Sequence, residues 1–198
     1  MKRKIGLFNI FVLITSLLMP SILKCKTAVL VIASRGYQPT EYGVTKDILE
    51  KNGITVVTVS NKAGTARADD GSSTTVDKTL DNLTLEDFDG IFFIGGSGAL
   101  LHLNKPISHS LLQEAVKNNK IIGAICISPR ILAQAGVLVR KHATGWDGDG
   151  QLSKVFNAYG AIHTKKEVVV DGNIVTATDP TAATGFGNAI VKLLKKST

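Results

Sequence analysis

The sequence predicts an α/β protein with a mostly parallel central sheet between layers of helices. Apolar runs at 27–33, 91–94 and 121–125 are typical of strands that are buried on both faces. Segments with apolar residues three and four positions apart separate these runs, which favours right-handed strand-helix-strand crossovers. The chain has 198 residues, of which 44% are hydrophobic and 20% are charged, and this composition suits one globular domain.

The first half of the chain is expected to alternate strand, helix and strand before it becomes polar. The helix after the first strand should begin at Thr40 as its N-cap and stop at Gly53, which can adopt the left-handed conformation. The second strand is expected at 54–60. The Gly- and Thr-rich segment 61–87 predicts loops, with a short β excursion around 72–76.

The second half returns to regular alternation. The strand at 91–94 leads into the glycine-rich loop 95–98, and Ser108 is expected to cap the next helix. The remaining predicted elements are, in chain order, a strand at 121–125, a short helix ending at Gly136, strands at 167–170 and 174–178 joined by a hairpin turn at 171–173, and a final helix with Phe186, Ile190, Leu193 and Leu194 on its core face.

Three loops are expected to meet at the carboxyl ends of the parallel strands, where open α/β sheets place their sites. They are 34–41, 95–98 and 126–128. The glycine loop lacks the third glycine of a dinucleotide-binding pattern, because Leu101 stands there, so no nucleotide site is predicted. Two cysteines are too few for a disulfide scaffold or a Cys-based zinc site, and the sequence predicts no cofactor and no metal.

Cys126 stands at the junction between the strand at 121–125 and the helix that follows. A sharp strand-to-helix turn needs small residues two positions either side of a nucleophile, and Ala124 and Ser128 meet that need. A thiol over a helix N-terminus is expected to ionise below its free pKa of about 8.5. The alternative is a structural cysteine, buried as a small hydrophobic residue.

Residues 1–24 form a separate segment with the pattern of a secretory signal. Three basic residues precede an apolar stretch at 5–19 that ends at Pro20. Because small residues are missing around the cleavage point, an uncleaved anchor that enters a membrane through residues 5–23 stays open. The prediction is a secretory-route protein, whether secreted, periplasmic or membrane-anchored, with its domain at 25–198. A cytoplasmic location is the alternative.

The formal net charge of +7 overstates the basic character of the domain. Four cations and no acid lie in residues 1–24, so the remainder of the chain carries +3 (7 − 4). That remainder contains no basic patch interleaved with aromatic residues, and nucleic-acid binding is therefore not predicted.

Together these features resemble the ThiJ/PfpI superfamily, which includes the Parkinsonism-associated deglycase and is class I glutamine amidotransferase-like. The resemblance covers residues 26–196 and implies a flavodoxin-like three-layer sandwich with a mostly parallel central sheet. The motifs that carry it are, in chain order, Ile94-Gly95-Gly96, AICISP at 124–129, LAQAG at 132–136 and VDGNIVT at 170–176.

The resemblance also implies roles for four residues. Cys126 matches the family's nucleophile, and Glu41 matches the buried acid that hydrogen-bonds the thiol. The backbone N–H groups of Gly96 and Ile127 match the oxyanion hole. An ionised carboxylate beside the thiol would raise the thiol pKa by charge repulsion, so Glu41 helps the thiolate only when burial keeps the acid protonated.

The familiar histidine positions of the superfamily are empty. Many members carry His directly after the cysteine, where this chain has Ile127, and the Parkinsonism-related branch has one that aligns near Gly145. Without a base in reach, a Cys–His hydrolytic dyad is not predicted. His163 could approach from a loop as a base, but all four histidines are expected to be ordinary surface residues: His102, His109, His142 and His163.

The function implied by the resemblance is a cysteine-dependent protein acting on small reactive carbonyls such as methylglyoxal, as a deglycase- or glyoxalase-type hydrolase or lyase, or responding to peroxide through Cys126. The alternative is a non-enzymatic redox-sensing or chaperone-like dimer. A cysteine peptidase or amidase ranks last. The resemblance implies a homodimer, and whether the chain turns over a substrate is left open by the sequence.

Overall fold

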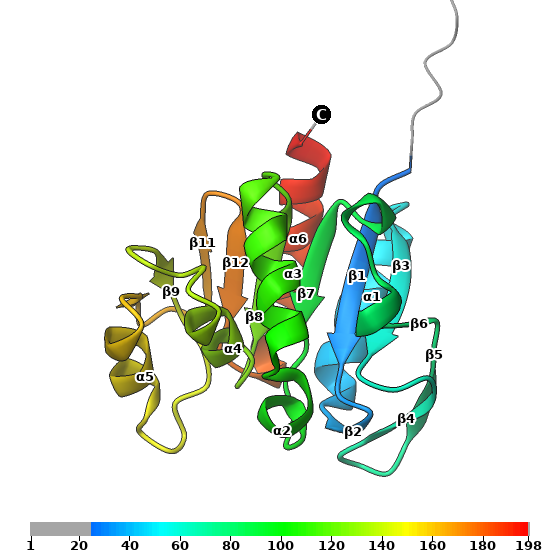
Figure 1. Ribbon diagram of the computed structural model, residues 1–198, viewed down its shortest axis with the longest axis horizontal. Coiled ribbons are helices and arrows are strands. Elements are labelled where there is room, and N and C mark those ends of the chain that lie inside the picture. The colour runs from blue at the N-terminus through cyan, green and yellow to red at the C-terminus, as the bar shows by residue number, and fades with distance from the viewer. Residues whose placement is uncertain (1–24, 198) are drawn as a thin grey trace, which may run out of the picture.

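The computed structural model describes residues 25–197, which build a seven-stranded central sheet (Figure 1). Its strands are, in chain order, β1 (Thr27–Ile32), β3 (Thr55–Ser60), β6 (Lys78–Thr79), β7 (Gly90–Phe93), β8 (Ile121–Ile125), β11 (Val168–Asp171) and β12 (Ile174–Ala177). Their spatial order is β11-β12-β8-β7-β1-β3-β6, and neighbours run parallel except in the β11–β12 hairpin. The predicted α/β class with a mostly parallel sheet is confirmed.

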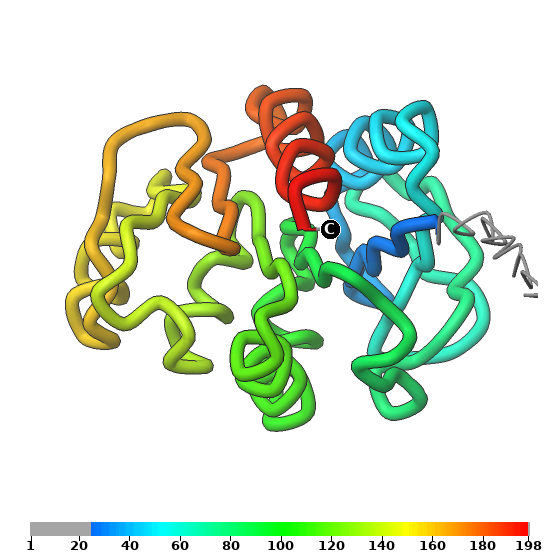
Figure 2. The backbone as a smooth tube through the Cα atoms, turned by 90° about the horizontal axis from the view of Figure 1, so that it is seen from above, coloured from blue at the N-terminus to red at the C-terminus, as the bar shows by residue number. Residues whose placement is uncertain are grey.

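Helices cover both faces of this sheet. The helices of residues 25–197 are α1 (Pro39–Lys51), α2 (Ala99–Leu103), α3 (Pro106–Lys117), α4 (Pro129–Gln134), α5 (Leu152–Ala158) and α6 (Ala183–Lys196), with short 3-10 helices η1 (Leu80–Asn82), η2 (Leu85–Asp87) and η3 (Pro180–Ala182). Helices α1 and α6 pack side by side on one face, and α3 and α4 lie on the other (Figure 2). The result is the expected flavodoxin-like three-layer sandwich, with its core between the sheet and the two helical layers.

Two smaller sheets extend this core. One contains β2 (Arg35–Tyr37), β4 (Gly64–Ala68) and β5 (Ser73–Val76), and the other pairs β9 (His142–Ala143) with β10 (Ile162–His163). The expectation of loops in 61–87 was therefore wrong at β4, β6, η1 and η2, whereas the β excursion expected around 72–76 is β5. Strands β4 and β5 pair antiparallel with each other, and β4 also pairs with β2. Pairing with neighbouring strands therefore stabilises an extended conformation that the polar sequence does not predict.

Two helices begin earlier than the sequence pattern predicts. The N-cap of α1 is Gln38, whose side chain accepts the N–H of Glu41, so Thr40 lies inside the first turn. Helix α3 begins at Pro106, and Ser108 is a buried residue of that helix. Both helices have proline in the first turn, where its missing N–H leaves no helical hydrogen bond unmade.

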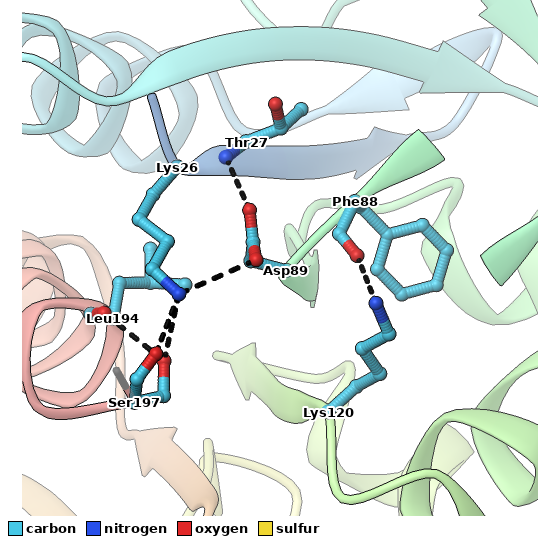
Figure 3. Close-up of polar contacts among 7 residues, drawn as sticks. All are labelled: Lys26, Thr27, Phe88, Asp89, Lys120, Leu194 and Ser197. Atoms are coloured by element: carbon cyan, nitrogen blue, oxygen red, sulfur yellow. Dashed lines mark hydrogen bonds and ion pairs between the residues drawn. The ribbon is translucent and has the colours of Figure 1, made fainter. Parts of the chain in front are cut away.

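A cluster of polar contacts closes the amino edge of the sheet, where β1 and β7 begin and α6 ends. Figure 3 shows Asp89 accepting the Thr27 N–H (2.8 Å) and pairing with Lys26 (3.5 Å). Lys26 also donates to the Ser197 carbonyl at 2.5 Å. These bonds join the starts of two central strands to the carboxyl end of the last helix.

The predicted signal segment 1–24 lies outside the described residues. Among residues 25–197, no helix has the length and apolar content needed to cross a membrane.

We expect Asp89→Ala to lower the free energy of unfolding by about 1–3 kcal/mol, because the Thr27 N–H and the Lys26 ammonium would lose their shared partner. Urea denaturation measures this loss. Asp81→Ala is the matched control, since Asp81 is exposed in η1, and it should leave stability nearly unchanged. Equal stabilities for the two variants would show that the amino-edge contacts contribute little.

Candidate active site

The carboxyl ends of three adjacent strands bring the predicted loops together. Val31 of β1 pairs with Phe93 of β7, and Phe93 pairs with Ala124 of β8. The three strands therefore end at one level, at the lower edge of the molecule in Figure 1. Cys126 follows β8 there, and the glycine loop 95–98 follows β7.

Cys126 is held in a strained backbone conformation. Its φ is +63°, in the left-handed region that residues with a side chain rarely adopt. Its N–H donates to the Ala177 carbonyl (3.0 Å), and its own carbonyl accepts the Trp146 N–H (2.7 Å). The buried Ser128 hydroxyl donates to the Ile94 carbonyl at 2.8 Å. Such a conformation costs about 1–3 kcal/mol and persists only where the surrounding structure imposes it.

Glu41 lies fully buried beside this thiol. It comes from the first turn of α1, and its Oε2 accepts the Gly95 N–H at 2.9 Å. A Cβ on Gly95 would lie 2.7 Å from Glu41 Oε2 and 3.1 Å from Cys126 Sγ, so the carboxyl and the thiol share the space that this glycine leaves open. The second carboxyl oxygen, Oε1, is buried and has no hydrogen-bond partner within residues 25–197. It is therefore available for a proton.

Burial raises the pKa of Glu41 from 4.5 to about 7, because water no longer solvates the carboxylate. The Gly95 N–H acts in the opposite direction, since it stabilises the charged form, but its effect is smaller. Near neutral pH, Glu41 therefore exists in both protonated and ionised forms.

The pKa of the Cys126 thiol is raised, whereas the sequence analysis predicted that it is lowered. Burial raises the pKa of Cys126, and the negative charge of Glu41 raises it further. The N–H groups of Ile127 and Gly96 lower it by less. The expectation of a thiol pKa below about 8.5 was wrong, because it counted the helix terminus and left out these two larger contributions. Two negative charges in contact repel, so the Glu41–Cys126 pair titrates as a unit.

The two backbone N–H groups expected as an oxyanion hole both face the Cys126 sulfur. They come from Gly96 and Ile127, and neither donates to a backbone carbonyl within residues 25–197. Gly96 has φ +113°, and a Cβ there would lie 2.3 Å from the Gly36 carbonyl, so only glycine fits. The next N–H, of Ser97, donates to the Asp69 carboxylate (3.0 Å), which fixes the loop.

A cavity of about 390 Å³ opens at the thiol. Leu100 and Trp146 give it apolar walls, while Asp69 and Gln38 add polar groups. Its lining residues are Gln38, Asp69, Gly96, Ser97, Leu100, Cys126, Ile127 and Trp146. Trp146, Asp69 and Gln38 were missed in the sequence, because each reaches the cavity from a loop or helix end with no local motif of its own.

No histidine lines this cavity. His163 lines a neighbouring cavity of about 510 Å³ that shares the wall at Trp146, and its Nδ1 lies 2.7 Å from the Ser153 hydroxyl. A Cβ on Gly145 would lie 3.1 Å from the Cys126 carbonyl, so this position adjoins the site but carries no side chain. Within residues 25–197, no group of three His, Cys, Asp or Glu side chains is arranged to hold a metal ion. Cys25 and Cys126 are both free thiols.

Residues 26–193 match the DJ-1/PfpI family. The chain belongs to this family. A deglycase of Pyrococcus horikoshii is 33% identical over 148 residues, which are 74% of this chain and 87% of that protein. A glutathione-independent glyoxalase of Caenorhabditis elegans is 24% identical over 170 residues, covering 86% of this chain and 89% of the relative.

Solved structures of the DJ-1/PfpI family share the fold described above. A ThiJ/PfpI domain protein from Brachyspira murdochii superposes with a TM-score of 0.82 at 28% identity, covering 88% of this chain and 99% of the other. The sequence-based assignment to the ThiJ/PfpI superfamily is confirmed.

The raised pKa of Glu41 predicts that the stability of this DJ-1/PfpI protein falls as pH rises. The folded protein holds the Glu41 proton up to about pH 7, whereas the unfolded chain releases it near 4.5. The stabilisation is therefore complete below about pH 4.5 and is lost as pH rises through about 7. A glutamine at position 41 does not titrate. The free energy of unfolding of Glu41→Gln, relative to that of wild type, should therefore rise by up to about 3 kcal/mol as the pH increases from 4.5 to above 7.

Denaturant titrations at several pH values test this expectation. Glu114→Gln, at an exposed position of α3, is the control and should follow the wild-type pH dependence. A pH-independent difference between Glu41→Gln and wild type would contradict the raised pKa.

The charge of Glu41 should also control the pKa of the Cys126 thiol. Glu41→Ala removes the negative charge beside Cys126, and Glu41→Gln removes it while keeping a hydrogen-bond donor. The apparent pKa of the Cys126 thiol should therefore be highest in wild type, lower in Glu41→Ala and lowest in Glu41→Gln, with a total decrease of about one pH unit or more. The pH dependence of alkylation by iodoacetamide, in a Cys25→Ser background, measures it. A wild-type pKa below that of Glu41→Ala would mean that the acid donates its proton to a resting thiolate.

Proposed function

We propose that this protein is an enzyme of the deglycase or glyoxalase kind that acts on small reactive carbonyls, such as methylglyoxal, through Cys126. The observation that carries the proposal is the buried Glu41 carboxyl with a pKa of about 7 beside the thiol. A general base is most effective when its pKa lies near the working pH. Relatives named as a deglycase and a glyoxalase support the same class of chemistry.

The proposed first step needs no histidine. The Glu41 carboxylate accepts the thiol proton as Cys126 Sγ attacks the aldehyde carbon. The S–C bond forms while the π pair of the carbonyl moves onto oxygen, and the N–H groups of Gly96 and Ile127 stabilise this oxyanion. Glu41 then returns the proton to the oxygen, which gives a neutral hemithioacetal.

The cavity suits a small substrate. Its volume of about 390 Å³ is near the lower end of ligand pockets. Leu100 and Trp146 lie on its walls, where they can exclude water from the reacting carbon.

The raised thiol pKa argues against the rival function of a non-enzymatic redox sensor. Peroxide oxidises the thiolate, so susceptibility follows the thiolate fraction of the resting protein. Burial and the Glu41 charge both reduce that fraction at Cys126. In the proposed mechanism, by contrast, Glu41 removes the thiol proton only when the substrate is in place, so a resting thiolate is not needed.

The proposal also includes an oligomeric state, which the family resemblance implies, and a role for the N-terminal segment, which its sequence pattern implies. The protein would form a homodimer. Residues 1–24 would act as a secretory signal or as an anchor through residues 5–23, and the catalytic domain would follow from residue 25.

We expect methylglyoxal turnover to depend on both members of the Glu41–Cys126 pair. Cys126→Ser should abolish turnover, and Glu41→Gln should lower kcat/KM about 100-fold or more because the base is lost. Wild-type kcat/KM should fall as pH drops below about 7, where Glu41 takes up its proton. Steady-state kinetics across this pH range measures all three effects.

Cys25→Ser and His163→Ala serve as controls, because Cys25 is an exposed thiol and His163 lines the neighbouring cavity. Both should keep near wild-type turnover. If His163→Ala instead removed activity, the base would be that histidine and the role of Glu41 would be wrong.

A further inference from the structure

A third cavity, of about 390 Å³, lies beside the small sheet β2-β4-β5. It is lined by two arginines, three hydroxyl residues and one glycine: Ser34, Arg35, Thr65, Arg67, Gly71 and Ser73. No carboxylate lines it. The mechanism proposed above uses none of these side chains.

The fold places the two arginines on neighbouring strands. Arg35 of β2 and Arg67 of β4 are register partners in a parallel pair, so their guanidinium groups extend from neighbouring backbone positions. Both side chains are exposed, so water screens part of the repulsion between these like charges. Within residues 25–197, neither guanidinium makes an ion pair or a hydrogen bond.

The two acids that follow Arg67 in the sequence accept hydrogen bonds from other residues. Asp69 accepts the N–H and the hydroxyl of Ser97, and Asp70 accepts the N–H and the hydroxyl of Ser72. Neither lines the cavity. The positive charge of Arg35 and Arg67 is therefore balanced by no carboxylate within the cavity.

We propose that this cavity binds an oxyanion such as phosphate. Guanidinium groups present planar pairs of N–H donors that match phosphate oxygens, and an anion between two arginines would relieve their repulsion. The hydroxyls of Ser34, Thr65 and Ser73 add donors around the same space. Gly71 lies 3.7 Å from the Arg67 guanidinium at the place where a Cβ would stand, and its φ of +86° favours glycine in this wall.

The site adjoins the Cys126 cavity. The turn between β4 and β5 contributes Asp69 to that cavity and Gly71 to the arginine cavity. The phosphate therefore has two sources, a separate small anion or a group carried by the carbonyl substrate. The second source rests on the proposed function, and the first does not.

Titration calorimetry with inorganic phosphate at low salt tests the site on the full chain. Wild type should bind one phosphate, and Arg35→Gln and Arg67→Gln should each weaken binding about tenfold or more. Arg67→Lys should fall between Arg67→Gln and wild type, because lysine keeps the charge but loses the planar pair of donors. The Gly71 amide NMR signal should shift on binding.

Lys192→Gln is the matched control, since it removes one positive charge from an exposed position of α6. It should bind phosphate like wild type. Absence of phosphate binding would overturn the proposal. Equal weakening in Lys192→Gln and Arg67→Gln would also overturn it, because the binding would then come from diffuse surface charge.

A comparison in Cys126→Ser separates the two sources. Glyceraldehyde 3-phosphate should bind more tightly than inorganic phosphate if the anion belongs to the carbonyl substrate, and equally if it is a separate molecule. Failure of methylglyoxal turnover would reject the proposed enzyme and leave the phosphate titration as an independent test of this site.

Discussion

The missing side chain of Gly95 is the constraint on which the candidate site depends. A Cβ there would lie 2.5 Å from the Cys126 Cβ and 2.7 Å from Glu41 Oε2, so a larger residue would force the acid and the thiol apart. The same residue donates its N–H to Glu41 and accepts the Gln38 N–H through its carbonyl. One glycine thus joins the start of α1, the loop after β7 and the turn after β8.

The sequence predicted the central strands best, because burial on both faces leaves a continuous apolar run. The run at 121–125 coincides with β8. Strand β4 could not be predicted in this way, since it contains Gly, Thr and Arg and no continuous apolar run. Its extended conformation depends on pairing with β2 and β5. The helix starts were misplaced because Thr40 and Ser108 are good N-cap types, while prolines set the actual first turns.

The candidate site was predictable where a motif marks it. The family motifs placed Glu41 beside Cys126, and the structure has both at Gly95. Trp146 and Asp69 carry no such motif. The Trp146 N–H donates to the Cys126 carbonyl, and the Asp69 carboxylate accepts the Ser97 N–H. The direction of the thiol pKa was misjudged, since burial depends on the packing of the whole edge rather than on the local turn.

A carboxylate beside the thiol has a different consequence from a histidine in the same place. An imidazolium would stabilise the thiolate and hold the cysteine ionised at rest. Glu41 has the opposite effect, because its charge keeps the thiol protonated while its own pKa of about 7 keeps it able to accept a proton. In the proposed mechanism, Glu41 takes the thiol proton only as the sulfur attacks the carbonyl carbon. The N–H groups of Gly96 and Ile127 stabilise the negative charge that develops on the carbonyl oxygen. The empty histidine positions at Ile127 and Gly145 are therefore compatible with catalysis by a cysteine that stays protonated between turnovers.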